Sequence, residues 1–251
     1  MAPSYDHLRV RLIQIRERPD VLAEEQASFQ TRCALRPEQF LLTNALRDDL
    51  TASLLDDADA VLIGGAGAYS VTHSYGWTQS LIDLCQACAD RQVPLFGSCW
   101  GHQFIARAFG GHVVHDMDRA EMGTHEVDLT EAGMADPLFA PFPRRFAAQM
   151  GHQDRVAELP DGAVELARND VAPFQAFRLA DAPIYGTQFH SELDHEAERE
   201  RLYAYRDHYP EMQVDDRFQE TLASLRPTPD VDGLLERFLR LFAVEESAQA
   251  A

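Results

Sequence analysis

Short apolar runs alternate with helical stretches along the N-terminal part of the chain, and this alternation constrains the fold more than any other feature. The runs predicted as strands are Val10–Ile15, Gln39–Leu42, Ala58–Ile63 and Pro94–Gly97, and the stretches predicted as helices are Val21–Leu35 and Trp77–Ala89. Such alternation is typical of a parallel, doubly wound sheet flanked by helices. We therefore expect an α/β fold whose ligands bind at the carboxyl ends of the strands.

The second half of the chain has a different pattern. After Gly111, short strand-like segments alternate with turn residues, which predicts mostly antiparallel strands that continue the same domain. Residues 192–211 are rich in charge and are interpreted as a solvated helix with i,i+4 ion pairs. The last helix carries apolar residues on one face that we expect to dock on the sheet: Val231, Leu234, Leu235, Phe238, Leu239 and Phe242.

These segments predict a single domain over residues 1–245, of which 193–245 is a C-terminal helical extension, and a disordered tail over 246–251. The N-terminus has no long apolar region of the kind found in signal peptides. Four cysteines are no disulfide framework for a chain of 251 residues. We expect a cytoplasmic protein without a membrane segment, since polar residues interrupt the uncharged stretch 60–82.

Acidic residues dominate the charge of the chain. The net charge is −19, and all 22 basic residues are arginine. A nucleic-acid partner is not expected, because phosphate binding requires a basic surface. The acidic, lysine-free composition has two interpretations that the sequence leaves open. It suits a protein that stays soluble in high salt, and it also suits a GC-rich genome that encodes Arg in place of Lys.

The segment PLFGSCWGHQFIARAFGG, residues 94–111, combines a predicted strand, one cysteine and an amphipathic stretch. Cys99 lies between Gly97 and Gly101. A nucleophile elbow needs small residues at these positions, because the chain turns sharply from strand to helix there. The positive end of the helix dipole favours the thiolate, which is the attacking form. The alternative is a buried cysteine in a glycine-rich packing turn.

A nucleophilic cysteine needs a base and a group that orients the base. His190 follows the apolar run PIYGTQF, so we expect it at the carboxyl edge of the sheet. Glu192 is close enough to accept a hydrogen bond from the imidazole and to fix its tautomer. An isolated histidine at a strand end would be ordinary, whereas this pair together with the elbow favours catalysis.

Two backbone amides are candidates for an oxyanion hole. The Trp100 N–H follows the nucleophile, and the Gly65 N–H lies in the loop LIGGAGAY after a predicted strand. A simple glycine turn is the alternative for this loop. A dinucleotide-binding loop fits less well, because the G-x-G-x-x-G spacing is absent and no helix follows directly.

Taken together, these segments resemble the class I glutamine amidotransferases. GSCWGHQ resembles the G-x-C-x-G-x-Q elbow of the family, QFHSE its His-x-Glu segment and LIGGAGAYSV its oxyanion loop. MGHQDRVAELPDG is similar to a segment of the glutaminase domain of GMP synthase. The resemblance runs in order through residues 10–195 and implies the flavodoxin-like fold of that family.

The resemblance implies a catalytic triad of Cys99, His190 and Glu192, with Gln103 helping to bind the substrate L-glutamine. The sulfur would attack the side-chain amide and ammonia would leave, giving a γ-glutamyl thioester from which water then releases glutamate. No cofactor and no metal ion are expected in this chemistry.

This sequence departs from the family pattern in three places. Ala66 and Ser191 stand where the family usually has Pro, and we expect both to be tolerated because neither side chain performs the chemistry. No synthetase domain follows the glutaminase segment, so we expect ammonia to pass to a separate synthetase subunit.

Two other functions remain open at this point. The same triad would serve a stand-alone γ-glutamyl hydrolase or peptidase that acts on a larger γ-glutamyl amide. A non-catalytic binding relative is the third alternative, although an intact Cys–His–Glu set argues against it.

Three further features have simpler interpretations. Cys85 and Cys88 form C-x-x-C on a predicted helix, but no second pair of ligands exists, so we expect them on the buried helix face. His152 and Asp154 are expected at the active-site edge, as residues that shape substrate binding. Tyr69 is a candidate for the mouth of the pocket.

Overall fold

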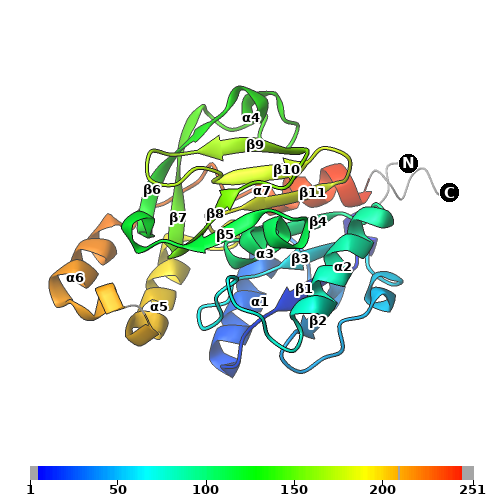
Figure 1. Cartoon of the computed structure of the whole chain (residues 1–251), viewed down its shortest axis with the longest axis horizontal. Helices are drawn as coiled ribbons and strands as arrows, with labels where there is room; N and C mark the ends of the chain where they lie inside the picture. Colours follow the sequence, from blue (N-terminus) through cyan, green and yellow to red (C-terminus); the bar gives the residue numbers. More distant parts are fainter. Residues whose placement is uncertain (1–4, 209, 245–251) are drawn as a thin grey trace.

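The fold is described here from a computed structural model for residues 5–208 and 210–244 (Figure 1). In this part of the chain, one sheet of nine strands has the order β2-β1-β3-β4-β11-β10-β9-β6-β7, and β5 pairs with β8 separately. The strands are β1 (Val10–Gln14), β2 (Phe40–Asn44), β3 (Ala60–Ile63), β4 (Leu95–Ser98), β5 (His112–His115), β6 (Glu121–Leu129), β7 (Arg145–His152), β8 (Asp154–Glu158), β9 (Ala163–Arg168), β10 (Ala176–Leu179) and β11 (Ile184–Thr187).

Helices connect these strands and form the C-terminal part of the described chain. The α-helices are α1 (Pro19–Cys33), α2 (Thr78–Asp90), α3 (Trp100–Ala108), α4 (Glu131–Ala135), α5 (His195–Tyr205), α6 (Asp215–Ser224) and α7 (Leu234–Phe238). A π-helical turn, η7 (Leu239–Ala243), continues α7. Short 3₁₀ turns are η1 (Tyr5–His7), η2 (Pro37–Gln39), η3 (Ala52–Leu55), η4 (Met117–Arg119), η5 (Arg206–His208) and η6 (Pro210–Gln213).

The sheet confirms the predicted doubly wound α/β class. Strands β2, β1, β3, β4 and β11 are parallel to one another. Each predicted strand and helix of the N-terminal part is present, with bounds that agree to within two residues. The parallel pairing aligns Ser98 with Thr187, so β4 and β11 end side by side. The loops after these two strands therefore begin at the same edge of the sheet.

Antiparallel strands extend the sheet, as the second half of the sequence predicts. Strands β10, β9, β6 and β7 follow β11 in antiparallel order. Strand β11 is the exception to the predicted antiparallel pattern of the second half, because it pairs in parallel with β4 in the centre of the sheet. The chain thus returns to the centre of the fold just before residues 188–192.

Apolar side chains pack on both faces of the sheet. Helices α1 and α7 cover one face and α2 and α3 cover the other. Phe238 of α7 lies 5.2 Å from the ring of Phe96 and 5.9 Å from that of Tyr185, measured between ring centroids, which confirms the predicted docking of the last helix. Cys85 and Cys88 are buried on α2, as predicted.

The interpretation of residues 192–211 as a solvated helix is wrong. Helix α5 buries one face, which carries Glu198, Arg201, Leu202 and Tyr205. These positions recur at helical spacing and pack toward α1 and the carboxyl edge of the sheet, where Glu24 and Glu192 form ion pairs with Arg201. Figure 1 shows α5 and α6 together at one side of the sheet. The predicted tail lies outside the described residues.

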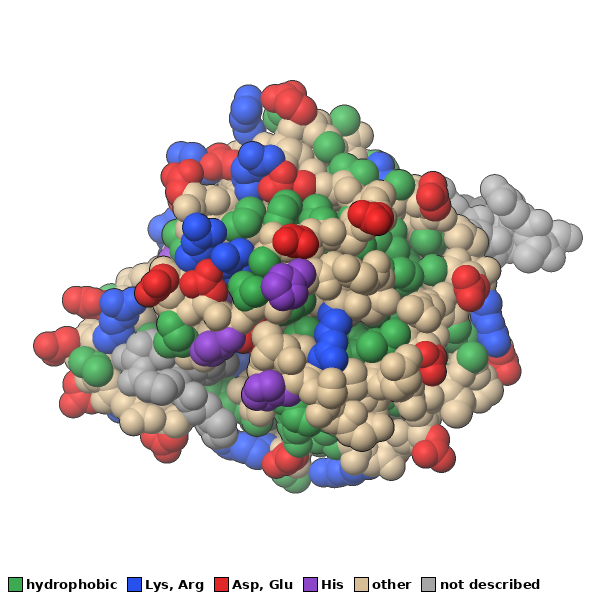
Figure 2. Space-filling model, in the orientation of Figure 1, with side chains coloured by type: hydrophobic (Ala, Val, Ile, Leu, Met, Phe, Trp, Pro, Cys, Tyr) green, Lys and Arg blue, Asp and Glu red, His purple; other side chains and the backbone are tan. Residues whose placement is uncertain are grey.

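Arginine and acidic side chains lie intermixed on the face shown in Figure 2, without one continuous basic patch there. This distribution agrees with the acidic composition of the chain. No helix within the described residues has both the length and the apolar character needed to cross a bilayer.

Candidate active site

Cys99 lies at a strained turn between β4 and α3. Its backbone has φ 50° and ψ −99°, a left-handed φ that a non-glycine residue adopts at a cost of about 1–3 kcal/mol. The amide of Cys99 donates to the Thr187 carbonyl of β11 at 2.8 Å, which holds the turn against the neighbouring strand. Such strain, maintained by the surrounding structure, is typical of functional sites.

The two glycines around Cys99 are required by space. A Cβ atom on Gly97 would lie 2.4 Å from the backbone carbon of Gly101, and a Cβ atom on Gly101 would lie 2.3 Å from the carbonyl oxygen of Ile63. Both distances are far below van der Waals contact. The glycine pattern therefore results from helix α3 packing directly against β3 and β4, as at a nucleophile elbow.

His190 and Glu192 form a buried pair. Their side chains contact each other between His190 Nδ1 and Glu192 Oε1 at 2.8 Å, and each residue is at most 4% exposed. The other carboxylate oxygen of Glu192 accepts a hydrogen bond from Ser98 Oγ at 2.5 Å, and Arg201 Nη1 donates to Oε1 at 3.1 Å. The carboxylate is thus held by three side chains, which fixes the orientation of the imidazole.

His190 and Glu192 each stabilise the charged form of the other. Burial alone would lower the pKa of His190, but the Glu192 carboxylate and the Cys99 sulfur outweigh burial and hold this pKa well above its usual range. Burial would raise the pKa of Glu192, yet His190, Arg201 and Ser98 lower it overall. The imidazole is therefore a strong proton acceptor beside a carboxylate that stays ionised.

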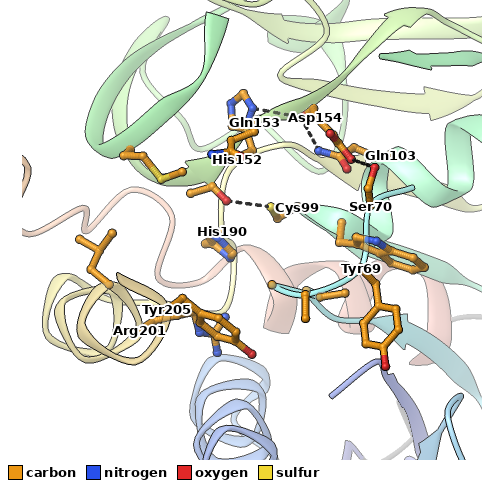
Figure 3. A pocket seen from close by; sticks show the side chains of 18 of the residues that line it. Tyr69, Ser70, Cys99, Gln103, His152, Gln153, Asp154, His190, Arg201 and Tyr205 are labelled. Carbon is orange, nitrogen blue, oxygen red and sulfur yellow. Dashed lines mark hydrogen bonds between the residues drawn. The ribbon is translucent and has the colours of Figure 1, made fainter. Parts of the chain in front are cut away.

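Cys99 and His190 line one cavity of about 210 Å³ (Figure 3). The sulfur lies 3.8 Å from the carbonyl oxygen of Gly151 and 3.8 Å from Gln188 Nε2. His190 is held next to β7, because its amide donates to the Gln149 carbonyl at 2.9 Å. The two residues come from neighbouring parallel strands, so the sheet brings together side chains that are far apart in the sequence.

The two expected oxyanion donors differ in their surroundings. Trp100 begins α3, where the first amides have no partner within the helix. The Gly65 N–H, in contrast, donates to Glu25 Oε1 at 3.1 Å, and that carboxylate is completely buried. Gly65 lines the cavity, but its amide can hold an oxyanion only after it leaves Glu25.

The opposite wall of the cavity carries the other expected residues. Gln103 lines the cavity, and its side-chain nitrogen donates to the Asp154 carbonyl at 2.5 Å and to Gln188 Oε1 at 3.2 Å. Asp154 accepts from Ser70 Oγ at 2.5 Å and contacts His115 Nδ1 at 2.8 Å. This wall is polar and largely fixed by hydrogen bonds within the protein.

His152 and Tyr69 also line the cavity. His152 contacts Glu121 Oε2 at 3.1 Å through its Nε2, so its ring is held by a buried carboxylate. Tyr69 lines the cavity, and its ring lies 5.1 Å from that of Tyr75 in an edge-on arrangement. Among the described residues, no group of three or more His, Cys, Asp or Glu side chains is arranged to hold a metal ion.

Helix α5 supplies site residues that the sequence analysis missed. Its buried face lines the cavity with Glu198, Arg201, Leu202 and Tyr205. These residues share one helix face at spacing i, i+3, i+4 and i+7, but two of the four are charged, so the face has no apolar pattern by which the sequence could have revealed it.

A second buried network joins α5 to the glycine loop. Arg16, after β1, lies 2.9 Å from Glu25 Oε1, and its Nη1 donates to Tyr205 Oη at 2.9 Å. The same Glu25 oxygen accepts from the Gly65 amide. One chain of contacts therefore links helix α5 to the loop that carries the expected oxyanion donor.

An α/β sheet with a cysteine elbow and a strand-end His–Glu pair defines the class of protein. The model of the family described as "Glutamine amidotransferase class-I" matches residues 26–206, and the chain belongs to that family.

Relatives of known name support this membership. The chain is 40% identical over 103 residues to a glutamine-hydrolysing GMP synthase subunit of Pyrococcus abyssi, a match that covers 41% of this chain and 53% of the relative. It is 30% identical over 161 residues to the protein of the same name from Archaeoglobus fulgidus, covering 64% of this chain and 81% of the relative. The match to the first of these relatives thus spans only about half of that relative's length.

Solved structures share the fold. A glutamine amidotransferase from Methylobacillus flagellatus has a TM-score of 0.71 at 22% identity, covering 95% of this chain and 94% of that chain. A glutamine amidotransferase from Thermotoga maritima has a TM-score of 0.68 at 22% identity, covering 94% of this chain and 99% of that chain. At this level of identity the likeness concerns the fold alone.

Proposed function

We propose that this protein hydrolyses the side-chain amide of L-glutamine through a covalent intermediate on Cys99. One observation carries the proposal: a cysteine at a strained elbow lines the same cavity as a buried His190–Glu192 pair. The family of the chain supports the same reaction class. Cys99 acts as nucleophile, His190 as general acid and base, and Glu192 as the group that orients the imidazole.

The reaction proceeds in two halves. The Cys99 thiol gives its proton to His190, and the sulfur bonds to the side-chain carbonyl carbon of glutamine. The carbon–nitrogen bond breaks while His190 protonates the departing ammonia, leaving a γ-glutamyl thioester. Water then gives a proton to His190 and attacks the thioester, releasing glutamate, and the proton returns to the sulfur.

The proposed oxyanion donors are the amides of Trp100 and Gly65. Loss of one such donor raises a barrier by about 3 kcal/mol in enzymes of this type of chemistry. Because the Gly65 amide donates to Glu25 in this structure, the proposal requires that substrate binding replace that hydrogen bond. Gln103 is proposed to bind the amino-acid part of glutamine from the opposite wall.

A separate synthetase subunit is the proposed recipient of the ammonia. The names of the relatives, which are subunits of a GMP synthase, support this part of the proposal. We further propose that residues 1–245 act as one unit in the cytoplasm, with helix α5 of the 193–245 extension lining the cavity.

A stand-alone γ-glutamyl hydrolase is the second candidate function. It is favoured by one observation: the cavity continues past Cys99 to helix α5, where it reaches Glu198 and Leu202. A substrate larger than glutamine would occupy this space.

Ammonia release from L-glutamine by the purified protein tests the proposal directly. We expect turnover by the isolated chain or in the presence of its synthetase partner, together with labelling of Cys99 by a glutamine-mimicking electrophile. Absence of both turnover and labelling would contradict the proposal and favour a non-catalytic relative. Faster release of amine from γ-glutamyl amides than of ammonia from glutamine would favour the second candidate.

A further inference from the structure

Glu198 is a buried carboxylate that the proposed mechanism does not use. Its residue is 2% exposed, and it lines the cavity from helix α5. Its Oε2 atom accepts no hydrogen bond from any described residue. A carboxylate buried in this way is costly unless a ligand or another charge compensates for it, so its presence at a cavity calls for a partner.

Glu198 lies on the same side of the cavity as the catalytic imidazole. A methyl group on Gly151 would lie 3.2 Å from His190 Nε2 and 3.4 Å from Glu198 Oε1. Both atoms therefore lie close to one point of the β7 backbone. Figure 3 shows Gln103, Ser70 and Asp154 across the cavity from the imidazole, beyond Cys99.

This placement identifies the part of the substrate that Glu198 faces. In the proposed function, on which this inference rests, His190 protonates the leaving nitrogen of the amide. A group attached to that nitrogen would extend along the wall formed by His190 and α5. The amino-acid part of the substrate would extend toward Gln103, on the other side of the sulfur.

Glu198 offers a cationic ligand a buried carboxylate oxygen that has no hydrogen-bond partner among the described residues. Glu24 on α1 and Glu192 after β11 add negative charge near Glu198, whereas His190 and Arg201 add positive charge. Arg201 already forms two ion pairs through its Nη atoms, and its Nε has no hydrogen-bond partner among the described residues. Arg201 contacts Glu24 at 2.5 Å and Glu192 at 3.1 Å, and Arg16 contacts Glu25.

Glu198 therefore remains as the carboxylate without an arginine partner. Burial raises the pKa of Glu198 to about 7, against the opposing charges of His190 and Arg201. An ammonium group beside this carboxylate would hold it in its ionised form and form charge-assisted hydrogen bonds with it.

We propose that Glu198 binds a protonated amine on the leaving-group side of the scissile amide, so that γ-glutamyl amides of short diamines are substrates of this site. The Cys99 sulfur bonds to the γ-carbonyl carbon, the carbon–nitrogen bond breaks, and the leaving nitrogen takes its proton from His190. The free diamine departs with its distal ammonium intact. Water then releases glutamate from the thioester, as with glutamine.

The test compares two substrates of matched shape. One is the mono-γ-glutamyl amide of propane-1,3-diamine, and the other is γ-glutamyl-n-butylamide, in which a methyl group replaces the distal ammonium. We expect kcat/KM to be about 10- to 100-fold higher for the cationic amide, the range that corresponds to a hydrogen bond with a charged group. The wild-type ratio requires no variant, so the test holds even if a variant fails to fold.

Glu198→Gln is the informative variant, and we expect it to bring the ratio of the two kcat/KM values close to one. Glu200→Gln is the matched control, because Glu200 is exposed on the same helix and the charge change is identical. This control should keep the wild-type ratio. Circular dichroism of both variants checks their folding.

Several outcomes would overturn the inference. One is a wild-type ratio of kcat/KM, cationic amide over butylamide, of one or less. Another is a Glu198→Gln ratio equal to that of wild type. A third is an equal loss of kcat/KM on both amides in Glu198→Gln, which would place Glu198 at the γ-glutamyl part that the two substrates share. L-Glutamine assayed in parallel separates the two proposals. If glutamine is hydrolysed but neither amide is, this inference alone fails. If no substrate reacts and Cys99 is never acylated, the proposed function fails and takes this inference with it.

Discussion

The two sides of the cavity are built in different ways. The Cys99 side is positioned by the ends of the parallel strands β4 and β11, whose pairing brings Cys99 next to the His190 loop. The other side is helix α5, whose buried Arg201 is held by ion pairs to Glu24 and Glu192. A rigid sheet thus presents the reactive groups, and a charged helix closes the space beside them. If the proposals above hold, reactivity and substrate choice reside in different elements of this fold.

The largest expected effect concerns the sheet side. Cys99→Ala removes the proposed nucleophile, and we expect kcat for glutamine to fall by about 10⁴-fold or more. The melting temperature should not fall, because a smaller residue at a strained turn leaves the packing of α3 on the sheet in place. Steady-state ammonia assays and thermal unfolding measure the two quantities. Turnover of glutamine by Cys99→Ala at the wild-type rate would show that the sheet side does not carry the nucleophile.

A smaller effect is expected on the α5 side, and it concerns stability. Arg201→Met removes the guanidinium that pairs with Glu24 and Glu192, which leaves buried negative charge uncompensated. We expect a loss of about 3–5 kcal/mol in the free energy of unfolding, measured by chemical denaturation.

Arg199→Met is the matched control on the opposite side of the same helix. Its partner Glu196 is exposed, and exposed pairs contribute about 0–1 kcal/mol. An equal loss of unfolding free energy in Arg201→Met and Arg199→Met would show that α5 is a solvated helix.

The smallest effect is a pH dependence of stability that originates in Glu192. The pKa of Glu192 is lower in the folded protein than its ordinary value of 4.5, so this carboxylate stabilises the fold above that pH. The stabilisation should decline as pH falls below 4.5 toward the folded value. Denaturation curves at a series of acidic pH values should show a shallower decline for Glu192→Gln. The same slope in both proteins would assign acid sensitivity to other groups.

Much of the sheet side could be predicted from the sequence. Strands buried on both faces are continuous apolar runs, and glycines are obligatory where α3 contacts β3 and β4, so both signals are local. The family resemblance and the fold class are confirmed by the family match and by the solved structures.

The α5 side could not be predicted in the same way. A charged residue such as Arg201 is buried only because distant carboxylates on α1 and after β11 compensate for it, and no local pattern reports those partners. The hydrogen bond from Gly65 to Glu25 is missing from the sequence analysis for the same reason, since α1 and the loop meet only in the folded chain. The roles of the triad, of the oxyanion donors and of Gln103 remain predictions.

Intact-protein mass spectrometry of rapidly quenched reactions with L-glutamine tests the central claim most directly. The account predicts a transient mass gain equal to one γ-glutamyl group, located on the peptide that contains Cys99 and absent from Cys99→Ala. Glutamine consumption without any acylated protein, or acylation of a different residue, would contradict it.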